Sequence, residues 1–352
     1  MRNITVGSRT IGDDQPSWIV AELSANHNQS LDRAIEIVRA AAGAGADAVK
    51  LQTYTADTLT LDCDRDCFRI GGDSLWAGRT LHELYSEAYT PWEWHGRLQQ
   101  AAHDEGIECF STPFDATAVD FLESLNVPVY KVASFELVDI PLLQRIAATG
   151  RPIIASTGMA TMAEIEEAVR TLRSGAGGRE LALLKCTSAY PANPADMNLQ
   201  TIPHMADTFD VVAGLSDHTM GSAVAVAAVT LGARIVEKHF TLRRNDSGPD
   251  STFSMEPDEF AGMVRDIRAV EAALGVVNYT RTADEAKNVQ FRRSLFVVED
   301  VAAGELFTPQ NVRSIRPAQG LHTRHLSEVL GRRAASRIER GTPLSWAHVA
   351  HD

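Results

Sequence analysis

The chain has 352 residues, of which 44% are hydrophobic and 22% are charged, a composition that excludes a disordered or fibrous protein and allows a large core. Its formal net charge of −13 argues against a nucleic-acid-binding protein. Neither a signal peptide nor an apolar run long enough to cross a bilayer is evident, so the sequence predicts a cytoplasmic protein with no membrane or nucleic-acid partner.

In chain order, eight short apolar runs alternate with segments of helical spacing. The runs are SWIVAEL, DAVKLQT, IECFST, PVYKVAS, PIIAST, ELALLKCT, DVVAGLS and ARIVEKHF. Segments between them, such as LDRAIEIVRAAAGAG and MAEIEEAVRTL, repeat apolar residues at helical intervals. This alternation predicts an α/β fold, the (β/α)8 TIM barrel, over residues 1–280. An open doubly wound sheet is the alternative, which the lack of a G-x-G-x-x-G motif after the first run disfavours.

One connection is too long for a simple barrel loop. Nearly forty residues separate Thr53 from the helix expected near Pro91, on the side where the active site of a barrel lies. The large rings of this segment could hold apolar parts of a sugar or could simply pack the loop down; they are Trp76, Tyr85, Tyr89, Trp92 and Trp94.

Polar side chains occur where the predicted strands end. In a closed barrel these ends surround one pocket, so the side chains are expected to converge. Lysine and hydroxyl groups together suit a phosphate or a carboxylate, which indicates a small anionic ligand. The set comprises Lys50, Thr112, Lys131, Ser134, Ser156, Ser188 and Ser216, with Lys185 as a further source of charge. The alternative for each lysine is that it extends to solvent.

Two of the strands end in a histidine, at Ser216-Asp217-His218 and at Glu237-Lys238-His239. If the strands are neighbours, the imidazoles of His218 and His239 converge as a divalent metal requires. Residues two apart on a strand share a face, so the side chain of Glu237 is expected on the same face of the strand as His239. A structural histidine is the alternative for each.

The four cysteines fit a reducing compartment. Cys109 and Cys186 fall within predicted strands and are expected to be inert core thiols. Cys63 and Cys67 lie in an acidic loop, where a zinc site is the alternative, although no second cysteine pair follows at the spacing of a zinc finger.

The C-terminal segment differs in charge and in pattern. Residues 291–352 hold nine arginines and six acids, a net charge of +3, whereas the whole chain is at −13. The segment predicts short strands and turns, a small helix near LSEVLGRRAA and a last strand at PLSW. We therefore expect a linker over residues 281–290 and a second domain over residues 291–352.

Ten or more ordered motifs resemble those of the sialic acid synthase family. They include AELSANHNQS, KLQTYT, FSTPFD, YKVASFE, STGMA, LKCTSAYP, GLSDHTMG, EKHFTL, GPDSTFS and FRRSLFVVEDV, and they cover nearly the whole chain. The resemblance implies a TIM barrel followed by a small C-terminal antifreeze-like (SAF, β-clip) domain. It also implies that the chain condenses phosphoenolpyruvate with an amino sugar to give a nine-carbon 2-keto acid and phosphate.

Three segments favour one branch of that family. LWAGRTLHELYSEAYTPWEWH, SFELVDIPLL and NVRSIRP resemble the branch that uses a diacetamido-trideoxy-hexose, 2,4-diacetamido-2,4,6-trideoxy-L-altrose. The legionaminic acid and N-acetylneuraminic acid branches are the alternatives within the family. Outside it, a metal-dependent aldolase or a noncatalytic carbohydrate-binding protein would fit part of the pattern.

The resemblance implies a role for each candidate residue. His218 and His239 would hold a divalent metal (Mn, Mg or Co), and Glu22 would act as the acid-base group. Glu237 would orient His239 or bind the sugar, with an ion pair as the alternative. The sugar-side positions would be Gln52, Glu136, Tyr190 and Asp250.

Two positions depart from the family pattern. Ser188 stands where asparagine is common, and Ala318 replaces the first glycine of an R-P-G-x-G turn, although alanine resists a positive φ. Arg316 is retained in that turn. In the family this arginine reaches the barrel of a second subunit, which implies a homodimer with domain-swapped C-terminal domains.

Overall fold

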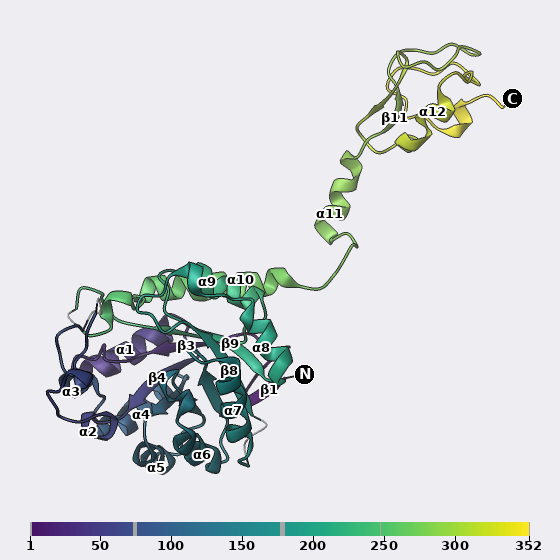
Figure 1. Cartoon of the computed structure of the whole chain (residues 1–352). Helices are drawn as coiled ribbons and strands as arrows, with labels where there is room; N and C mark the ends of the chain where they lie inside the picture. Colours follow the sequence, from purple (N-terminus) through teal and green to yellow (C-terminus); the bar gives the residue numbers. More distant parts are fainter. Residues whose placement is uncertain (1, 73–75, 177–179, 247, 352) are drawn as a thin grey trace. The chain divides into compact units, whose positions relative to one another are not determined.

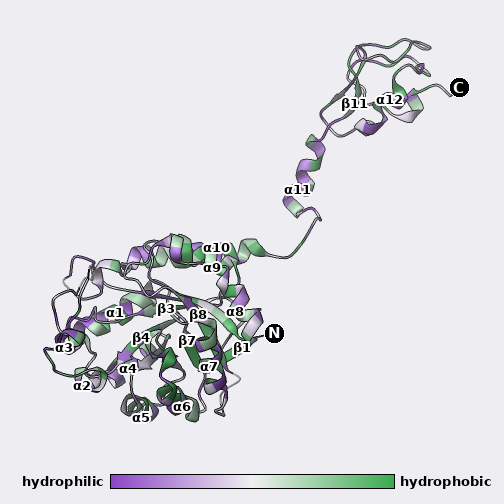
Figure 2. Cartoon of the chain, in the orientation of Figure 1, coloured by the Kyte–Doolittle hydropathy of each residue, from purple (hydrophilic) through white to green (hydrophobic). Residues whose placement is uncertain are grey.

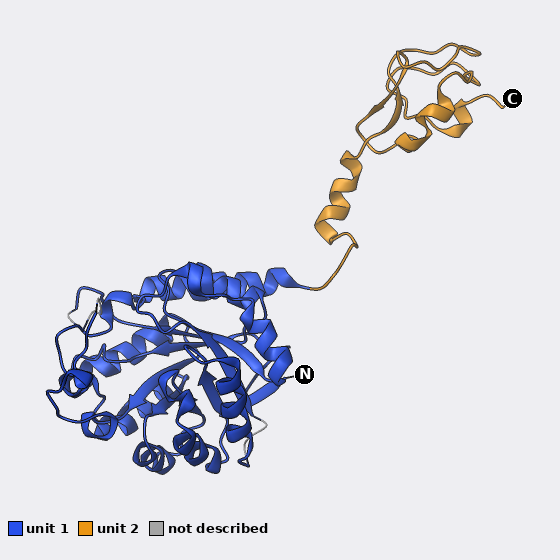
Figure 3. Ribbon diagram, in the orientation of Figure 1, with its two compact units in different colours: residues 1–275 blue, residues 276–352 orange. Residues whose placement is uncertain are grey.

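The computed structural model describes residues 2–72, 76–176, 180–246 and 248–351. The chain forms two compact units, residues 1–275 and residues 276–352 (Figure 3). Within the described residues, no helix is both long and apolar enough to span a bilayer.

The first unit is a closed barrel of eight parallel strands, which confirms the predicted fold (Figure 1). Each predicted run contains one strand, and the strands follow one another around the barrel in chain order until the last pairs with the first. They are β3 (Trp18–Glu22), β4 (Ala48–Thr53), β5 (Glu108–Pro113), β6 (Tyr130–Val132), β7 (Ile153–Ser156), β8 (Leu181–Cys186), β9 (Val212–Asp217) and β10 (Ile235–His239).

Helices follow the strands and cover the outside of the barrel. In Figure 2 most of their ribbons carry both green and purple, as expected for helices with one buried face, whereas the helix over AVAVAAVT is apolar at all but its last position. They are α1 (Leu31–Gly43), α4 (His95–Asp104), α5 (Ala116–Ser124), α6 (Ile140–Ala148), α7 (Met162–Arg173), α8 (Thr201–Phe209), α9 (Ala223–Thr230) and α10 (Pro257–Leu274).

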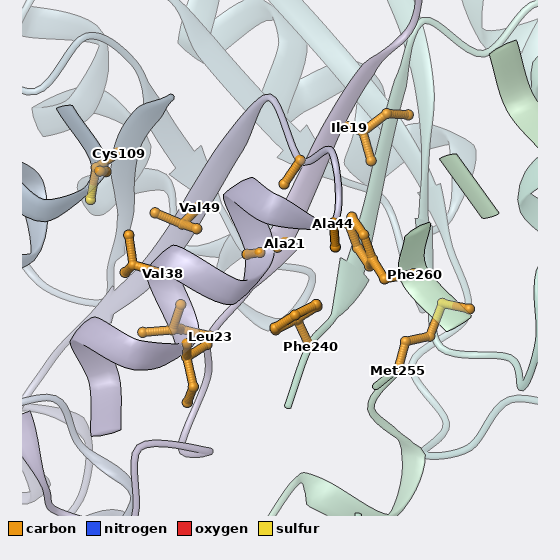
Figure 4. Packing of buried hydrophobic residues seen from close by; sticks show 14 of the residues in the cluster. Ile19, Ala21, Leu23, Val38, Ala44, Val49, Cys109, Phe240, Met255 and Phe260 are labelled. Atoms are coloured by element: carbon orange, nitrogen blue, oxygen red, sulfur yellow. The ribbon is translucent and has the colours of Figure 1, made fainter. Parts of the chain in front are cut away.

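A core between strands and helices fixes the barrel wall. In Figure 4, Ile19 and Ala21 of β3 lie against Val38 of α1 and Phe260 of α10. Phe240, just after β10, packs edge to face on Phe260 with ring centroids 5.3 Å apart. Since these side chains are fully buried, the ends of β3 and β10, which carry site residues, are held in place.

The N-terminal hairpin was not predicted from the sequence; it is formed by β1 (Asn3–Val6) and β2 (Arg9–Gly12). Its apolar residues Ile4, Val6 and Ile11 pack with Trp18 and Phe110, which point into the barrel. Trp18 and Phe110 stack with centroids 5.4 Å apart. The hairpin therefore closes the end of the barrel at which the strands begin.

The long connection after β4 contains regular structure. It includes α2 (Ala56–Leu59) and α3 (Leu81–Ala88), and α4 begins at His95, after a 3-10 turn at Trp92–Trp94 and not at Pro91. Residues 73–75 of this connection lie outside the described residues. Trp92 stacks on Phe121, with centroids 4.8 Å apart, and its Nε1 donates to the carbonyl of Tyr54, so this ring packs the loop down.

The first helix of the second unit is α11 (Ala283–Asn288), which lies within the stretch expected to be a linker. Its small core surrounds a two-stranded antiparallel sheet of β11 (Ser294–Val297) and β12 (Val312–Ile315), and α12 (Leu326–Val329) lies close to the predicted helix. The strand predicted at PLSW is wrong. Pro343 forms only an isolated bridge with Phe296, and Trp346 begins a 3-10 turn.

The turn that contains Ala318 requires no positive φ at that residue. Its backbone N–H donates to the carbonyl of Gln290 at 3.0 Å. Gly320 is the constrained position, because a Cβ there would lie 2.0 Å from the carbonyl oxygen of Leu295. The replacement of glycine by Ala318 is therefore compatible with the turn, and the strain expected from the sequence does not arise.

Candidate active site

The inward-facing residues of the barrel strands change from apolar to polar along each strand. On β3, Trp18 and Val20 belong to the interior core, and Glu22 follows at the same parity. On β10, Ile235 of that core is followed by Glu237 and His239. A cluster of polar side chains is thus formed at the carboxyl ends of the strands, where active sites of this fold lie, and it is the candidate pocket of the site.

Lys50 lies between two carboxylates at the centre of this pocket. Its Nζ is 2.9 Å from Glu22 Oε2 and 2.7 Å from Glu237 Oε1. Ser216 also donates to Glu237 Oε1, at 3.1 Å, while the backbone N–H of Ser24 donates to Glu22 Oε1 at 2.9 Å. All three charged side chains are buried, so the ion pairs act at reduced dielectric.

The two carboxyl groups have pKa values shifted in opposite directions. Burial raises the pKa of Glu22, and the nearby charge of Lys50 only partly opposes it. Burial alone would also raise the pKa of Glu237, but Lys131 and Lys50 outweigh it and lower this pKa to about 2. Such a divided pair favours a proton on Glu22 over one on Glu237, and separated carboxyl pKa values of this kind are used for general acid-base chemistry.

Lys131 on β6 is the second buried cation. Its Nζ donates to Ser156 Oγ at 2.7 Å and to the carbonyl of Val132 at 2.9 Å, which leaves one of its three donors for a ligand. Burial lowers the pKa of Lys131 to about 8, against the opposing effect of Glu237.

Ser134, Ser188 and Gly158 form a narrow cradle of donors at the ends of β6, β7 and β8. The N–H of Gly158 donates to Ser134 Oγ at 3.2 Å. A Cβ at Gly158 would lie 2.3 Å from Ser188 Oγ and 2.8 Å from Ser134 Oγ, so only glycine permits this approach. On β5, the Thr112 hydroxyl is buried without a hydrogen-bond partner among the described residues.

The two histidines converge as the sequence predicts, because β9 and β10 are neighbours. The ring centroids of His218 and His239 are 5.3 Å apart. His218 Nδ1 lies 3.0 Å from the carbonyl of Thr187, which can only accept, so this nitrogen carries a proton and Nε2 is the nitrogen left for a ligand. Burial opposes a charge on this ring, but Cys186 and the Thr187 carbonyl outweigh it and raise its pKa, so a metal at Nε2 would compete with a proton. His239 Nδ1 is buried with no partner among the described residues, and burial lowers the pKa of this ring.

These features fit a divalent metal. A neutral imidazole with an unsatisfied nitrogen is the form that binds such an ion. Within the part of the chain that the structure describes, however, no group of three or more histidine, cysteine, aspartate or glutamate side chains is arranged to hold one. The remaining positions would therefore fall to water and substrate, as in catalytic sites that keep open coordination positions.

Tyr190 forms an aromatic wall beside the histidines. Its ring centroid lies 4.4 Å from that of His218, 6.2 Å from His239 and 5.3 Å from Phe253. Trp76 of the long connection approaches Tyr190 with centroids 6.1 Å apart, and its Nε1 donates to the carbonyl of Pro249. The loop after β4 thus contributes to the mouth of the barrel.

The other predicted sugar-side residues differ in their surroundings. Gln52 Nε2 donates to Glu22 Oε1 at 3.2 Å, and Asp250 accepts a hydrogen bond from Ser24. Glu136 follows β6, and burial raises its pKa to about 7. Its Oε2 has no partner among the described residues. Arg316 lies exposed in the second unit.

Two expectations about strand residues need correction. Lys185 is on the outward face of β8, opposite to Leu184, and its Nζ donates to the carbonyl of Cys186. Cys186, expected in the core, faces the site, with its Sγ 3.9 Å from His218 Nδ1 and 4.0 Å from Ser188 Oγ. Burial would raise the pKa of this thiol, but His218 and Ser134 lower it to about 7. The parity of the strand was the signal that could have identified both positions.

Comparison with known proteins places the chain in a family of enzymes. The NeuB family model matches residues 37–279, and the chain belongs to this family. A SAF domain model matches residues 292–350, which confirms the predicted class of the second domain.

Individual relatives are similar over nearly their whole length. Pseudaminic acid synthase of Campylobacter jejuni is 44% identical over 331 residues, covering 94% of this chain and 96% of the relative. N,N'-diacetyllegionaminic acid synthase of Legionella pneumophila is 35% identical, covering 97% of each chain. The crystal structure of the spore coat polysaccharide biosynthesis protein spsE from Bacillus subtilis superposes with a TM-score of 0.67 at 34% identity, covering 99% of both chains.

Proposed function

We propose that this chain is a pseudaminic acid synthase, which condenses phosphoenolpyruvate with 2,4-diacetamido-2,4,6-trideoxy-L-altrose to give pseudaminic acid and phosphate. The observation that carries the choice of branch is the identity of 44% to a pseudaminic acid synthase, compared with 35% to a legionaminic acid synthase. The barrel mouth supports the chemistry, since it combines donors for anions with an acid-base pair and paired histidines.

The cradle and its neighbours are suited to the two anionic groups of phosphoenolpyruvate. Lys131 has a donor to spare, and Ser134, Ser188 and the orphaned hydroxyl of Thr112 add neutral donors. The same ligand would engage Lys50, Ser156 and Ser216, whose hydrogen bonds within the protein hold them in the pocket.

His218 and His239 would hold the divalent metal, for which manganese, magnesium and cobalt are the candidates. When bound, such an ion would polarise the aldehyde of the open-chain sugar as a Lewis acid. The chain's own contribution is to orient both rings, His218 through its hydrogen bond to the Thr187 carbonyl and His239 through burial, which also favours the neutral form of His239.

Glu22 is the acid-base group in this proposal. The C3 carbon of phosphoenolpyruvate forms the new bond to the aldehyde carbon, whose oxygen takes a proton from Glu22. Water then adds to C2 and gives one proton back to Glu22. As the C2–O bond to phosphate breaks, the remaining hydroxyl proton goes to the leaving phosphate and C2 becomes the ketone carbon. The raised pKa of Glu22 supports the first step, because the group must be protonated beforehand.

Glu237 and the aromatic wall would serve the sugar. Glu237 remains ionised beside His239 and can orient that ring or accept a sugar hydroxyl. Tyr190 offers an apolar face to an acetamido methyl group, while Gln52, Glu136 and Asp250 supply polar contacts.

Arg316 completes the proposed site from a second subunit. This trans arrangement is inferred from the family resemblance and implies a homodimer with domain-swapped C-terminal domains. The exposed position of Arg316 and the net charge of +3 on residues 291–352, in a chain with a net charge of −13, are compatible with it. The free cysteines among the described residues agree with the proposed cytoplasmic location.

Isotope labelling tests the reaction. Phosphoenolpyruvate with ¹⁸O in the bridging position is incubated with the hexose and a divalent metal, and both products are analysed by mass spectrometry. Breakage of the C2–O bond predicts labelled phosphate and an unlabelled nine-carbon acid. Labelled acid with unlabelled phosphate would overturn the proposed bond cleavage, and the absence of a nine-carbon acid would overturn the function.

A further inference from the structure

A buried ion pair lies directly behind the two histidines. Asp217 precedes His218 and Lys238 precedes His239, and these two residues are register partners on the neighbouring strands β9 and β10. Lys238 Nζ lies 2.6 Å from Asp217 Oδ2. Each residue is 1% exposed, so both charges are held away from water.

The pair belongs to the outward face of the barrel wall. Side chains alternate along a strand, and Glu237 and Ser216 share a hydrogen bond inside the barrel. Asp217 and Lys238 therefore do not face the pocket in which substrates would bind. Their influence on the site must pass through the backbone on which the histidines stand.

The same two side chains also fix the turn after His218. Asp217 Oδ1 accepts from the Thr219 N–H at 2.9 Å and from Thr219 Oγ1 at 2.7 Å. Lys238 Nζ donates to the Thr219 carbonyl at 2.6 Å. The backbone on both sides of His218 is thereby tied to the residue that precedes His239.

We propose that Asp217 and Lys238 are positioning residues that set the separation of the two imidazoles and thereby the affinity for a divalent metal. This inference rests on the proposed metal role of His218 and His239. A buried ion pair adds little stability compared with well-packed apolar residues of similar size, so stability alone does not explain two buried charges at this position. Groups that orient metal-binding histidines commonly change metal affinity by about 10- to 100-fold when they are removed.

The test replaces the pair with apolar residues in the full-length chain. The Asp217→Leu/Lys238→Met double variant leaves no unpaired charge, so it separates positioning from stability. Mn²⁺ binding is measured by electron paramagnetic resonance without substrates, and melting temperature is measured on the same samples. We expect binding about 10- to 100-fold weaker. The melting temperature should fall, because the buried N–H and carbonyl of Thr219 lose their partners, but the variant should remain folded at the temperature of the binding measurement.

A matched control lies at the opposite end of the barrel. Asp47, just before β4, pairs with Arg9 and Arg268. Asp47→Asn removes a charge from a comparable ion-pair cluster far along the strands from the histidines, so we expect unchanged Mn²⁺ affinity. If this control weakens binding as much as the double variant does, the effect is general loosening and the inference fails.

Histidine variants separate failure of the inference from failure of the proposed metal site. If His218→Ala and His239→Ala bind Mn²⁺ normally, the metal site itself is wrong. If they lose binding while the double variant binds as the wild type does, the positioning role alone is overturned. Should the double variant not fold, Asp217→Asn/Lys238→Met takes its place with the same two outcomes.

Discussion

Glu22 and Glu237 share the ammonium group of Lys50, yet their protonation is expected to differ. The difference arises because Lys131 acts with Lys50 on Glu237, whereas burial dominates for Glu22. Two similar side chains thus receive separate roles from their surroundings. The identity of each residue is visible in the sequence, but the sharing of one lysine depends on which strands are neighbours.

Glu22→Gln tests the acid-base role. The amide keeps the size of the side chain but cannot transfer the proton, so we expect kcat to fall about 10²- to 10⁴-fold with little change in KM for phosphoenolpyruvate. Steady-state kinetics provide the measurement. Glu271→Gln, at the other end of the barrel where Glu271 meets Ser17 and Arg268, is the control and should retain kcat. A Glu22→Gln variant with wild-type kcat would remove Glu22 from the mechanism.

The lowered pKa of Lys131 predicts that the binding of phosphoenolpyruvate depends on pH. Its pKa of about 8 means that the ammonium form, which binds an anion, is lost as the pH rises above 8. We expect KM for phosphoenolpyruvate to rise about tenfold per pH unit above that point. In the unfolded chain this lysine keeps its proton to a higher pH. The free energy of unfolding therefore rises with pH between the folded and unfolded pKa values of Lys131, whereas the affinity for phosphoenolpyruvate falls over the same range. Lys131→Met should show a high KM that does not change over this range; a wild-type profile in that variant would contradict the assignment.

Polar residues at the ends of the predicted strands were the pattern that predicted many candidate site residues, but this pattern could not show contacts between strands. It identified Glu22, Lys50, Lys131 and His239 because polar residues at strand ends interrupt apolar runs. It did not reveal the pairing of Asp217 with Lys238, which requires the register of β9 and β10. Orphaned polar atoms, such as Thr112 Oγ1, are likewise a property of the assembled barrel.

At the scale of elements, the turn from β7 to α7 brings backbone into the proposed phosphoenolpyruvate site. Gly158 is required there by the proximity of Ser134 and Ser188 rather than by a positive φ. The next residue, Met159, does adopt a positive φ of 64° and is exposed. Non-glycine residues in this region of φ cluster at functional sites.

Gly158→Ala should therefore damage the site more than the fold. The added Cβ would displace the hydroxyls of Ser134 and Ser188, so we expect KM for phosphoenolpyruvate to rise at least about tenfold, the loss of roughly one good hydrogen bond. Gly43→Ala in α1 is the matched control, because a Cβ there meets nothing within 4 Å. Kinetics and melting curves of both variants are compared; an unchanged KM in Gly158→Ala would show that the cradle does not bind this substrate.

Long apolar runs made the barrel strands predictable, whereas short elements were missed or misplaced. Each strand of the N-terminal hairpin has four residues, too few for a clear pattern, and its stability comes from Ile4, Val6 and Ile11 packing into the barrel end. In the PLSW segment, Leu344 packs in the small core of the second unit, but the segment forms only an isolated bridge and no regular strand. An apolar residue of this unit can therefore be buried without belonging to a β-strand.

At the scale of the whole molecule, the proposed role of Arg316 in a neighbouring subunit gives a complementation test. Arg316→Ala lacks the arginine and Glu22→Gln lacks the acid, so a mixed dimer contains one intact composite site. We expect the mixture to recover activity above either parent after subunit exchange, which native mass spectrometry monitors. Demonstrated exchange without recovered activity would contradict the trans arrangement.

The choice of sugar tests the central claim most directly. Catalytic efficiencies are compared for 2,4-diacetamido-2,4,6-trideoxy-L-altrose and for N-acetylmannosamine, each with phosphoenolpyruvate and Mn²⁺, and the acids are identified by NMR. The trideoxy sugar offers a methyl group and a second acetamido group to the site, each worth about 10- to 200-fold if the pocket is apolar at that point. We predict an advantage of at least about 100-fold for the trideoxy sugar and formation of pseudaminic acid. Equal efficiency with N-acetylmannosamine, or a product of different stereochemistry, would contradict the proposed function.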